Sequence, residues 1–274
     1  MPKAKGFRCR DAADSCPRGD ADVYRWMTLL VLLLPMAGCP QPFHPDTPVD
    51  PRVVREPTTD REYWLYLPSY YSDDRDWPLV VTLHGTFGWD SARAQVAEWK
   101  YVAEEKGFIV AAPKLRSVQG IIPVVKSWWY KDLEKDERMI LATIDDLRSR
   151  YRVDEKAVLL TGFSAGGYPL YHAGLRNPTR FNMLIARACN SDIGLFERLD
   201  FTDQTRTLPV AIYWGKDDLK AIRDQSWQAF EYLRRRECFA TTRKQVKGGH
   251  LRRPELAYRL WLKHLPRKYH KPGL

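Results

Sequence analysis

Ser164 stands at the centre of a short motif with a glycine at each end, Gly162 to Gly166. An apolar run, 157–160, precedes the motif, and a segment with a helical pattern, 168–176, follows it. Flanking glycines permit a strand-to-helix turn that is too sharp for side chains, so that the serine hydroxyl projects alone. A serine presented in this way is typical of a nucleophile that attacks carbonyl groups.

Two carboxylates follow a later apolar run. Residues 208–214 predict a buried parallel strand, and Asp217 and Asp218 are the second and third residues after its closing glycine, Gly215. A carboxylate in such a site holds a histidine in the correct tautomer and stabilises the imidazolium that forms. We assign this role to Asp218, because the third residue after the glycine is the usual position of the acid, and Asp217 is the alternative.

His250 closes the series at the end of a more polar predicted strand, 240–246. Imidazole titrates near neutrality, so His250 is the natural base to take the proton of the serine hydroxyl. Serine, then acid, then histidine is the chain order of the α/β-hydrolases. We therefore predict that these side chains meet at the carboxyl edge of one sheet.

A further strand and loop supply the groups that such chemistry needs for a developing oxyanion. Residues 78–83 predict a buried strand, which runs into the loop 84–88. We expect the backbone N–H groups of Thr86 and Ala165 to form the oxyanion hole. His84 is expected to brace this loop through hydrogen bonds rather than to take part in the reaction.

Aromatic residues gather in what the pattern suggests is a loop near residue 130. Trp128 and Trp129 are candidate substrate-binding residues, since such side chains offer large apolar contact areas. The alternative is that they pack on the hydrophobic core, and the sequence favours neither.

These motifs resemble those of a known family over about residues 60–266. The chain is similar to the poly(3-hydroxybutyrate) depolymerase and feruloyl-esterase-like branch of the α/β-hydrolases. The segments that carry the resemblance are 61–68, 83–85, 107–113, 162–167 and 248–250. The resemblance implies hydrolysis of carboxylic esters through an acyl-enzyme, with Ser164, Asp218 and His250 at the positions of the family's triad.

Composition agrees with one α/β domain. The chain has 274 residues, of which 44% are hydrophobic, which is enough for a full core. Strand and helix patterns alternate, with helices expected at 91–106, 136–151, 168–176, 221–237 and 254–265. We predict an α/β-hydrolase fold with a mostly parallel central sheet, helices on both faces and no large cap domain. The expected domain is 59–274.

The first 58 residues are expected to lie outside this domain. Residues 27–36 are almost wholly apolar, which is too short for a membrane span but typical of a signal-peptide core. The segment 36–39 resembles a bacterial lipoprotein box, which implies lipidation at Cys39. We therefore predict a leader over 1–38, a proline-rich linker over 39–58, and an exported protein that is either secreted or anchored in the cell envelope.

Charge is concentrated towards the C-terminus. The net charge is +10, and from Arg234 onward there are 13 Lys and Arg residues against 2 Asp and Glu. Such a run can contact anionic headgroups beside a lipid anchor, although a solvated surface is the more ordinary interpretation. No nucleic-acid partner is expected, because no base-stacking motif accompanies the charge. No metal or other cofactor is expected either.

The leading hypothesis is thus a serine esterase acting on a small-molecule or polymeric ester. Two alternatives remain: a serine peptidase of the same fold, and a non-catalytic envelope lipoprotein that uses the fold for binding. Peptidases of this fold generally carry a large additional domain, for which about 225 residues leave little room.

Overall fold

The computed structural model describes residues 49–118 and 126–270. The predicted leader and residues 39–48 of the predicted linker, Cys39 included, lie outside the described residues, as do residues 271–274 at the other end. In the described part of that predicted linker, Arg52–Glu56 forms a strand that pairs with Arg61–Tyr66, so the domain begins before the predicted boundary at residue 59. In the described ranges no helix is long and apolar enough to cross a membrane.

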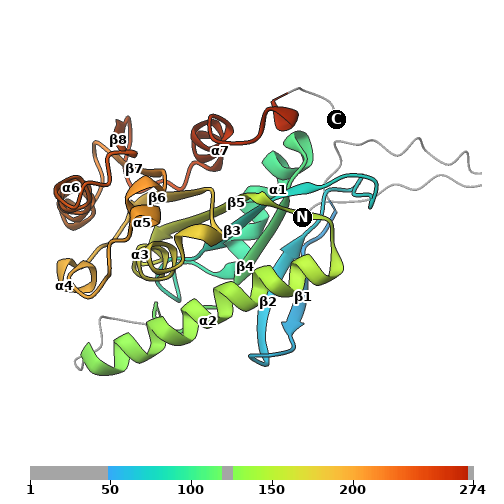
Figure 1. Ribbon diagram of the computed structural model, residues 1–274, viewed down its shortest axis with the longest axis horizontal. Helices are drawn as coiled ribbons and strands as arrows, with labels where there is room; N and C mark the ends of the chain where they lie inside the picture. The colour runs from blue at the N-terminus through green and yellow to red at the C-terminus, as the bar shows by residue number, and fades with distance from the viewer. Residues whose placement is uncertain (1–48, 119–125, 271–274) are drawn as a thin grey trace, which may run out of the picture. The chain divides into compact units, whose positions relative to one another are not determined.

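An eight-stranded sheet forms the centre of the domain (Figure 1). Its spatial order is β1-β2-β4-β3-β5-β6-β7-β8. The pairs β1–β2 and β2–β4 are antiparallel, and every later pair is parallel. The strands are β1 (Arg52–Glu56), β2 (Arg61–Tyr66), β3 (Trp77–Leu83), β4 (Ile109–Pro113), β5 (Val153–Ser164), β6 (Met183–Cys189), β7 (Val210–Gly215) and β8 (Thr241–Val246).

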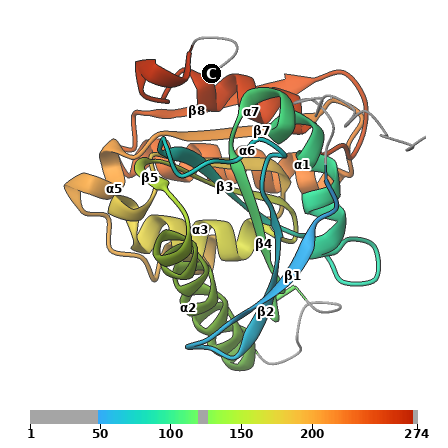
Figure 2. The same ribbon diagram turned by 90° about the vertical axis from the view of Figure 1, so that its right-hand side faces the viewer.

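Helices cover both faces of this sheet (Figure 2). One face carries α1 and α7, and the other carries α2, α3 and α6. The α-helices are α1 (Ala92–Lys106), α2 (Lys126–Arg150), α3 (Gly167–Arg176), α4 (Ile193–Phe196), α5 (Asp203–Thr207), α6 (Lys220–Arg235) and α7 (Pro254–Leu262). Two short 3₁₀ turns, Pro178–Arg180 and Arg267–Tyr269, complete the elements. The predicted layered α/β architecture with a mostly parallel sheet is confirmed.

Two hydrophobic cores result from this layering. Successive side chains of a strand point to opposite faces, so β3 sends Leu79 and Val81 into one core and Val80 into the other. Because both faces are covered, the central strands read as continuous apolar runs rather than as alternating ones. That is why the runs in β3, β5 and β7 were visible in the sequence.

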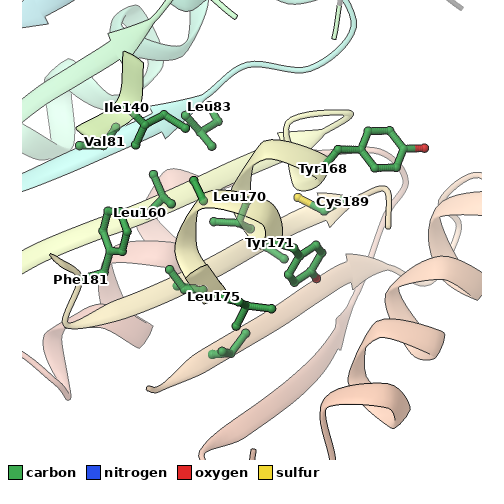
Figure 3. Packing of buried hydrophobic residues seen from close by; sticks show 14 of the residues in the cluster. Val81, Leu83, Ile140, Leu160, Tyr168, Leu170, Tyr171, Leu175, Phe181 and Cys189 are labelled. Atoms are coloured by element: carbon green, nitrogen blue, oxygen red, sulfur yellow. The ribbon is translucent and has the colours of Figure 1, made fainter. Parts of the chain in front are cut away.

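The helix that follows Ser164 is anchored deeply in one of these cores. Leu170, Tyr171 and Leu175 of α3 are fully or almost fully buried, and they pack with Leu160 of β5 and with Cys189 of β6 (Figure 3). Burying side chains of this size contributes about 2 kcal/mol each. The start of α3, and with it the serine turn, is thereby fixed against the sheet.

The helix expected at 136–151 begins ten residues earlier, at Lys126. The buried face continues backwards through Leu133 and Trp129, but Asp136, also fully buried, interrupts its apolar pattern. The Asp136 carboxylate accepts the backbone N–H groups of Arg116 and Ser117 and pairs with Arg61. Because Asp136 is buried for its tertiary contacts, it breaks the apolar periodicity, and the first ten residues of α2 were not predicted as helix.

The two cysteines of the domain are free and buried. Cys189 lies at the end of β6, with its Sγ 3.1 Å from the carbonyl oxygen of Gly162, and Cys238 follows α6. Burial raises the pKa of the Cys189 thiol to about 12 and that of Cys238 to about 11. Both behave as small apolar core residues.

Candidate active site

Ser164 lies at the junction of β5 and α3, in a strained turn. Its φ angle is 52°, in the left-handed region that a serine adopts only when the surroundings impose it. A Cβ atom at Gly162 would lie 2.5 Å from the carbonyl oxygen of Gly166, and one at Gly166 would lie 2.6 Å from the carbonyl oxygen of Leu83. Both flanking glycines are therefore needed by close backbone approach, as the sequence predicted.

Asp218 and His250 are brought together by the ends of β7 and β8. The Asp218 Oδ1 atom lies 2.8 Å from His250 Nδ1 and also accepts the backbone N–H of Leu219 at 2.7 Å. A carboxylate only accepts, so His250 donates through Nδ1 and its Nε2 is left as the acceptor nitrogen. Asp218 is buried, whereas the alternative acid, Asp217, is exposed.

Phe163 packs against the ring of His250. The two ring centroids are 4.6 Å apart, with the planes tilted by 35°. Phe163 is the residue immediately before Ser164, and its side chain is buried. The turn between β5 and α3 thus contributes a packing surface for His250 in addition to the serine itself.

The loop after β3 is braced by His84 and Asp90. His84 Nε2 accepts the backbone N–H of Leu115 at 3.1 Å, so its Nδ1 carries the hydrogen and donates to the carbonyl oxygen of Gly85 at 2.8 Å. Burial lowers the pKa of His84. The N–H of Gly85 donates to Asp90 Oδ2 at 2.7 Å. His84 therefore has the bracing position that we expected.

Two backbone N–H groups near Ser164 make no hydrogen bond within the described part of the chain. Among the described residues, neither Thr86 nor Ala165 has a hydrogen-bond partner for its N–H. Thr86 follows the braced Gly85, and a Cβ at Gly85 would lie only 3.1 Å from the Cβ of Ser164. The two loops are thus in close contact at the serine.

A pocket of about 860 Å³ opens over these residues. Its walls include Thr86, Ser164 and His250. The remaining lining is mixed: apolar side chains from Trp89, Phe163, Leu219, Ile222 and Leu251, and charged side chains from Asp90, Glu98, Arg252, Arg253 and Glu255. A pocket of this size and composition suits an organic molecule of moderate size.

Trp128 and Trp129 do not line this pocket, so the structure does not bring them to the predicted site. Both are in α2 rather than in a loop. Trp129 is buried, packs edge-on against Tyr168 with centroids 4.9 Å apart, and donates its indole N–H to Ser117. Trp128 is exposed. The sequence left open whether these side chains bind substrate or pack on the core, and Trp129 packs on the core.

Two residues of the site region were not foreseen. Asp90 and Arg252 form an ion pair at 3.1 Å, although they are 162 positions apart in the chain. Nothing in their local sequence distinguishes Arg252 from the other basic residues of the C-terminal run. In the described part of the chain, no cluster of three or more His, Cys, Asp or Glu is arranged to hold a metal ion.

Comparison with known proteins gives the family. Residues 55–247 match the model of the family described as "Putative esterase". Over 119 residues the chain is 32% identical to the bifunctional acetylxylan esterase/xylanase XynS20E of Neocallimastix patriciarum, covering 43% of this chain and 16% of that protein. Over 182 residues it is 22% identical to dipeptidyl-peptidase 5 of Porphyromonas gingivalis, covering 62% of this chain and 25% of that protein. The chain therefore spans a quarter or less of these relatives.

Solved structures show the same fold. The CE1 ferulic acid esterase AmCE1/Fae1A of Anaeromyces mucronatus, in complex with ferulic acid, superposes with a TM-score of 0.57 at 17% identity, covering 77% of this chain and 87% of that one. The predicted α/β-hydrolase fold is thereby confirmed. With the family match extending over more than half of its residues, the chain belongs to the esterase family of α/β-hydrolase fold.

Proposed function

We propose that this protein is a serine hydrolase that cleaves carboxylic esters through an acyl-enzyme. The observation that carries the proposal is the 2.8 Å contact between Asp218 and His250 in a pocket that also contains Ser164, within an esterase-family chain. Ser164 is the nucleophile, His250 the base and Asp218 the orienting acid.

The proposed reaction has two steps. Ser164 Oγ attacks the ester carbonyl while His250 Nε2 takes the hydroxyl proton, and the N–H groups of Thr86 and Ala165 stabilise the oxyanion. The tetrahedral intermediate then expels the alcohol, which receives the proton from His250, and an acyl-serine remains. Water, deprotonated by His250, attacks the acyl-serine, releases the carboxylic acid and returns the proton to Ser164.

The pocket supports a substrate with an apolar part. Trp89, Leu219 and Leu251 are exposed large hydrophobic residues, and all three lie in the pocket wall. An acyl or alcohol group with a ring or a short aliphatic chain would bury their surface, at about 25 cal/mol per Å². We therefore propose small aromatic or short aliphatic esters, free or attached to a polymer, as the substrates.

A fluorophosphonate probe tests the catalytic proposal. We expect the wild-type chain to be labelled covalently and Ser164→Ala to remain unlabelled, as read by intact-protein mass spectrometry. Hydrolysis of p-nitrophenyl acetate by the wild type should fall by about 10³-fold or more in Ser164→Ala. Equal labelling of both proteins, or of neither, would refute the proposal.

Peptidase activity is the alternative to be measured in the same assay. A similarity to dipeptidyl-peptidase 5 supports its inclusion. Peptide p-nitroanilides should be cleaved far more slowly than p-nitrophenyl esters by the same enzyme. The reverse preference would replace esterase by peptidase while leaving the roles of Ser164 and His250 in place.

We also propose that the protein is exported and lipidated at Cys39, where it would approach a membrane surface. The support is the apolar run 27–36 followed by a segment, 36–39, that resembles a lipoprotein box. The corresponding domain proposal is a leader over 1–38, a linker that begins at residue 39 and ends before β1, and a catalytic domain that includes β1 and extends to residue 274.

A further inference from the structure

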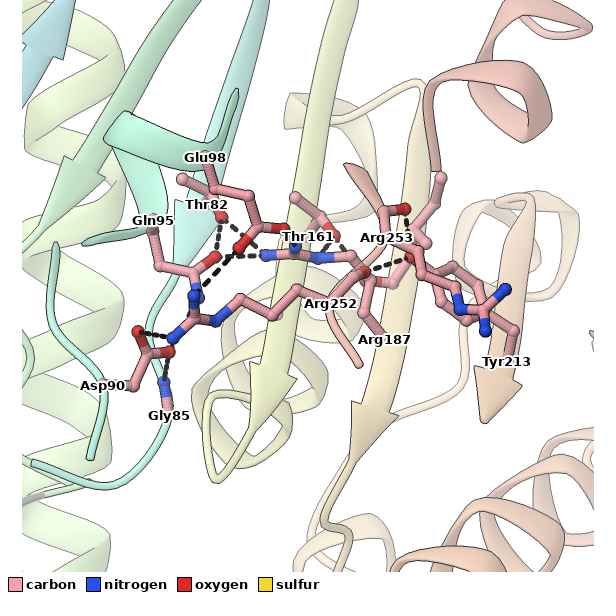
Figure 4. A network of polar contacts seen from close by, with 12 residues as sticks. Thr82, Gly85, Asp90, Gln95, Glu98, Thr161, Arg187, Tyr213, Arg252 and Arg253 are labelled. Carbon is pink, nitrogen blue, oxygen red and sulfur yellow. Dashed lines mark hydrogen bonds and ion pairs between the residues drawn. The ribbon is translucent and has the colours of Figure 1, made fainter. Parts of the chain in front are cut away.

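Arg252 joins the loop after β8, in which it lies, to the loop after β3. It stands two residues after His250, and its Nη2 lies 3.1 Å from Asp90 Oδ1 while its Nη1 lies 3.2 Å from Glu98 Oε2. Its guanidinium carbon is 5.3 Å from the ring centroid of Phe163. The Arg252 side chain thus contacts Asp90 in the loop after β3 and Glu98 in α1 (Figure 4). It also packs against the residue next to the nucleophile.

Asp90 connects Arg252 to the backbone of the proposed oxyanion loop. Its nearly buried carboxylate accepts three further hydrogen bonds, from the N–H of Gly85 at 2.7 Å, the N–H of Ser91 at 2.8 Å and the side-chain amide of Gln95 at 2.7 Å. The Gly85 bond orients the peptide between His84 and Gly85, which directly precedes the peptide that carries the Thr86 N–H. Any shift of Asp90 is therefore transmitted to the Thr86 N–H through one residue of backbone.

Glu98 connects the same arginine to the centre of the sheet. Its carboxylate also pairs with Arg187 at 3.4 Å, and Arg187, on β6, is fully buried. Arg187 in turn donates to Thr161 on β5 at 3.0 Å and to Thr82 on β3 at 2.8 Å. Charges alternate along the series Arg187, Glu98, Arg252 and Asp90.

This series depends on Arg252 for its charge balance. Burial raises the pKa of Glu98, and the guanidinium groups of Arg187 and Arg252 oppose that rise. If Arg252 is removed, Glu98 keeps only its pair with Arg187, and the buried carboxylate of Asp90 loses its ion pair. Leaving a buried charge without its partner is much more costly than the pair is stabilising.

The backbone at Arg252 has an anchor of its own. The hydroxyl of Tyr213, on β7, lies 2.7 Å from the carbonyl oxygen of Arg252 and 2.9 Å from that of Arg253. The main chain after His250 is therefore held independently of the arginine side chain. A side-chain substitution at Arg252 consequently releases the link between the loops without releasing the His250 loop from the sheet.

From these contacts we propose that Arg252 is a positioning residue: it fixes the Thr86 N–H relative to Ser164 and His250 by clamping Asp90 and Glu98. The inference rests on the proposed esterase function. A clamp of this kind acts on the transition state rather than on substrate binding, because the oxyanion forms only after attack.

The test compares Arg252→Gln with the wild type on p-nitrophenyl acetate. We expect kcat to fall by about 10- to 100-fold, with KM changed by less than about threefold. Arg252→Lys should recover part of kcat, since an ammonium group can pair with one carboxylate but lacks the two-pronged geometry. Arg259→Gln, which removes an exposed arginine of α7, is the matched control for loss of charge and should retain wild-type kcat.

A double-mutant cycle with Asp90→Asn provides a readout that a merely structural role would not give. In the clamp, Asp90→Asn added to Arg252→Gln should lower kcat by less than about threefold more, because the link is already broken. Thermal unfolding of each variant shows which of them are folded. If Arg252→Gln does not fold, Arg252→Lys replaces it in the comparison. Additive losses, an effect confined to KM, or unchanged kcat in both Arg252 variants would overturn the clamp in an active enzyme. A wild type without Ser164-dependent hydrolysis would overturn the proposed function itself.

Discussion

At the residue scale, the two adjacent carboxylates after β7 have different environments. Asp218 is buried and its Oδ1 is shared by His250 and the N–H of Leu219, while Asp217 faces solvent. In the described part of the chain, the second oxygen of Asp218 has no hydrogen-bond partner. The contact with His250 is therefore the only hydrogen bond between the Asp218 carboxylate and another side chain in the described part of the chain.

Substitution of each carboxylate by its amide separates the two candidates for the acid. In Asp218→Asn the side-chain amide could donate to His250 and favour the wrong tautomer, so we expect kcat to fall by about 10⁴-fold. Asp217→Asn is the matched control and should change kcat by less than about threefold, as exposed substitutions usually do. Ester hydrolysis under saturating substrate measures both. A larger loss in Asp217→Asn would transfer the role of the acid.

At the element scale, the loop after β3 depends on a neutral histidine. His84 donates through Nδ1 to Gly85 and accepts at Nε2 from Leu115, which is the start of the segment that follows β4. Protonation would convert the accepting nitrogen into a donor that faces another donor. The brace between β3 and β4 is therefore compatible only with the uncharged ring.

This requirement predicts acid sensitivity. Burial lowers the folded-state pKa of His84 below its ordinary value of 6.5, so below that pH the unfolded chain binds a proton that the fold does not. The stabilisation is complete above pH 6.5 and is lost as the pH falls through the folded-state pKa. As the pH falls from 6.5 to the folded-state pKa of His84, the unfolding free energy of the wild type should fall more steeply than that of His84→Gln. The difference in slope should be up to about 1.4 kcal/mol per pH unit.

Urea unfolding between pH 5 and 7.5 measures this difference. Burial also lowers the pKa of His264, with a smaller contribution from Lys263, but that residue is present in both proteins and its contribution cancels. Parallel pH dependences for wild type and His84→Gln would contradict the neutral brace.

At the scale of the whole molecule, the basic C-terminal run is divided among several roles. Arg252 pairs with Asp90 and Glu98, and Lys268 pairs with Asp154 at 2.8 Å. Other members of the run are exposed, such as Arg235 and Lys244. Part of the positive charge of the run is thus paired with acidic side chains of the same domain, and the remainder is available to an anionic surface.

Lipidation at Cys39 is the whole-molecule prediction. In a bacterial expression host we expect full-length protein to be recovered in the membrane fraction with a mass increase confined to Cys39, and Cys39→Ser to lack both. Such an anchor adds about 0.8 kcal/mol of membrane affinity for each buried methylene, so its loss should be evident on fractionation. Recovery of unmodified wild-type protein in the cytosol would refute this prediction.

Local pattern was sufficient for the parts of this protein that depend on neighbours in the chain. The glycines around Ser164, the continuous apolar runs of β3 and β7 and the position of His250 after β8 all express short-range sterics or a sheet buried on both faces. The fold class and family followed from these features. The roles of the triad residues remain predictions that the contacts support.

Only the tertiary structure decided which carboxylate meets His250, where α2 begins, that Trp129 packs in the core, and that Asp90 and Arg252 pair. Each depends on contacts between segments far apart in the chain, such as the 162 positions that separate Arg252 from Asp90. The local sequence does not distinguish a buried acid or arginine from an exposed one. The free energy of burying such a charge is set by the partners that folding brings to it. Sequence pattern records which surfaces must be buried, whereas the pairing of charges across those surfaces is determined by the packing of the complete fold.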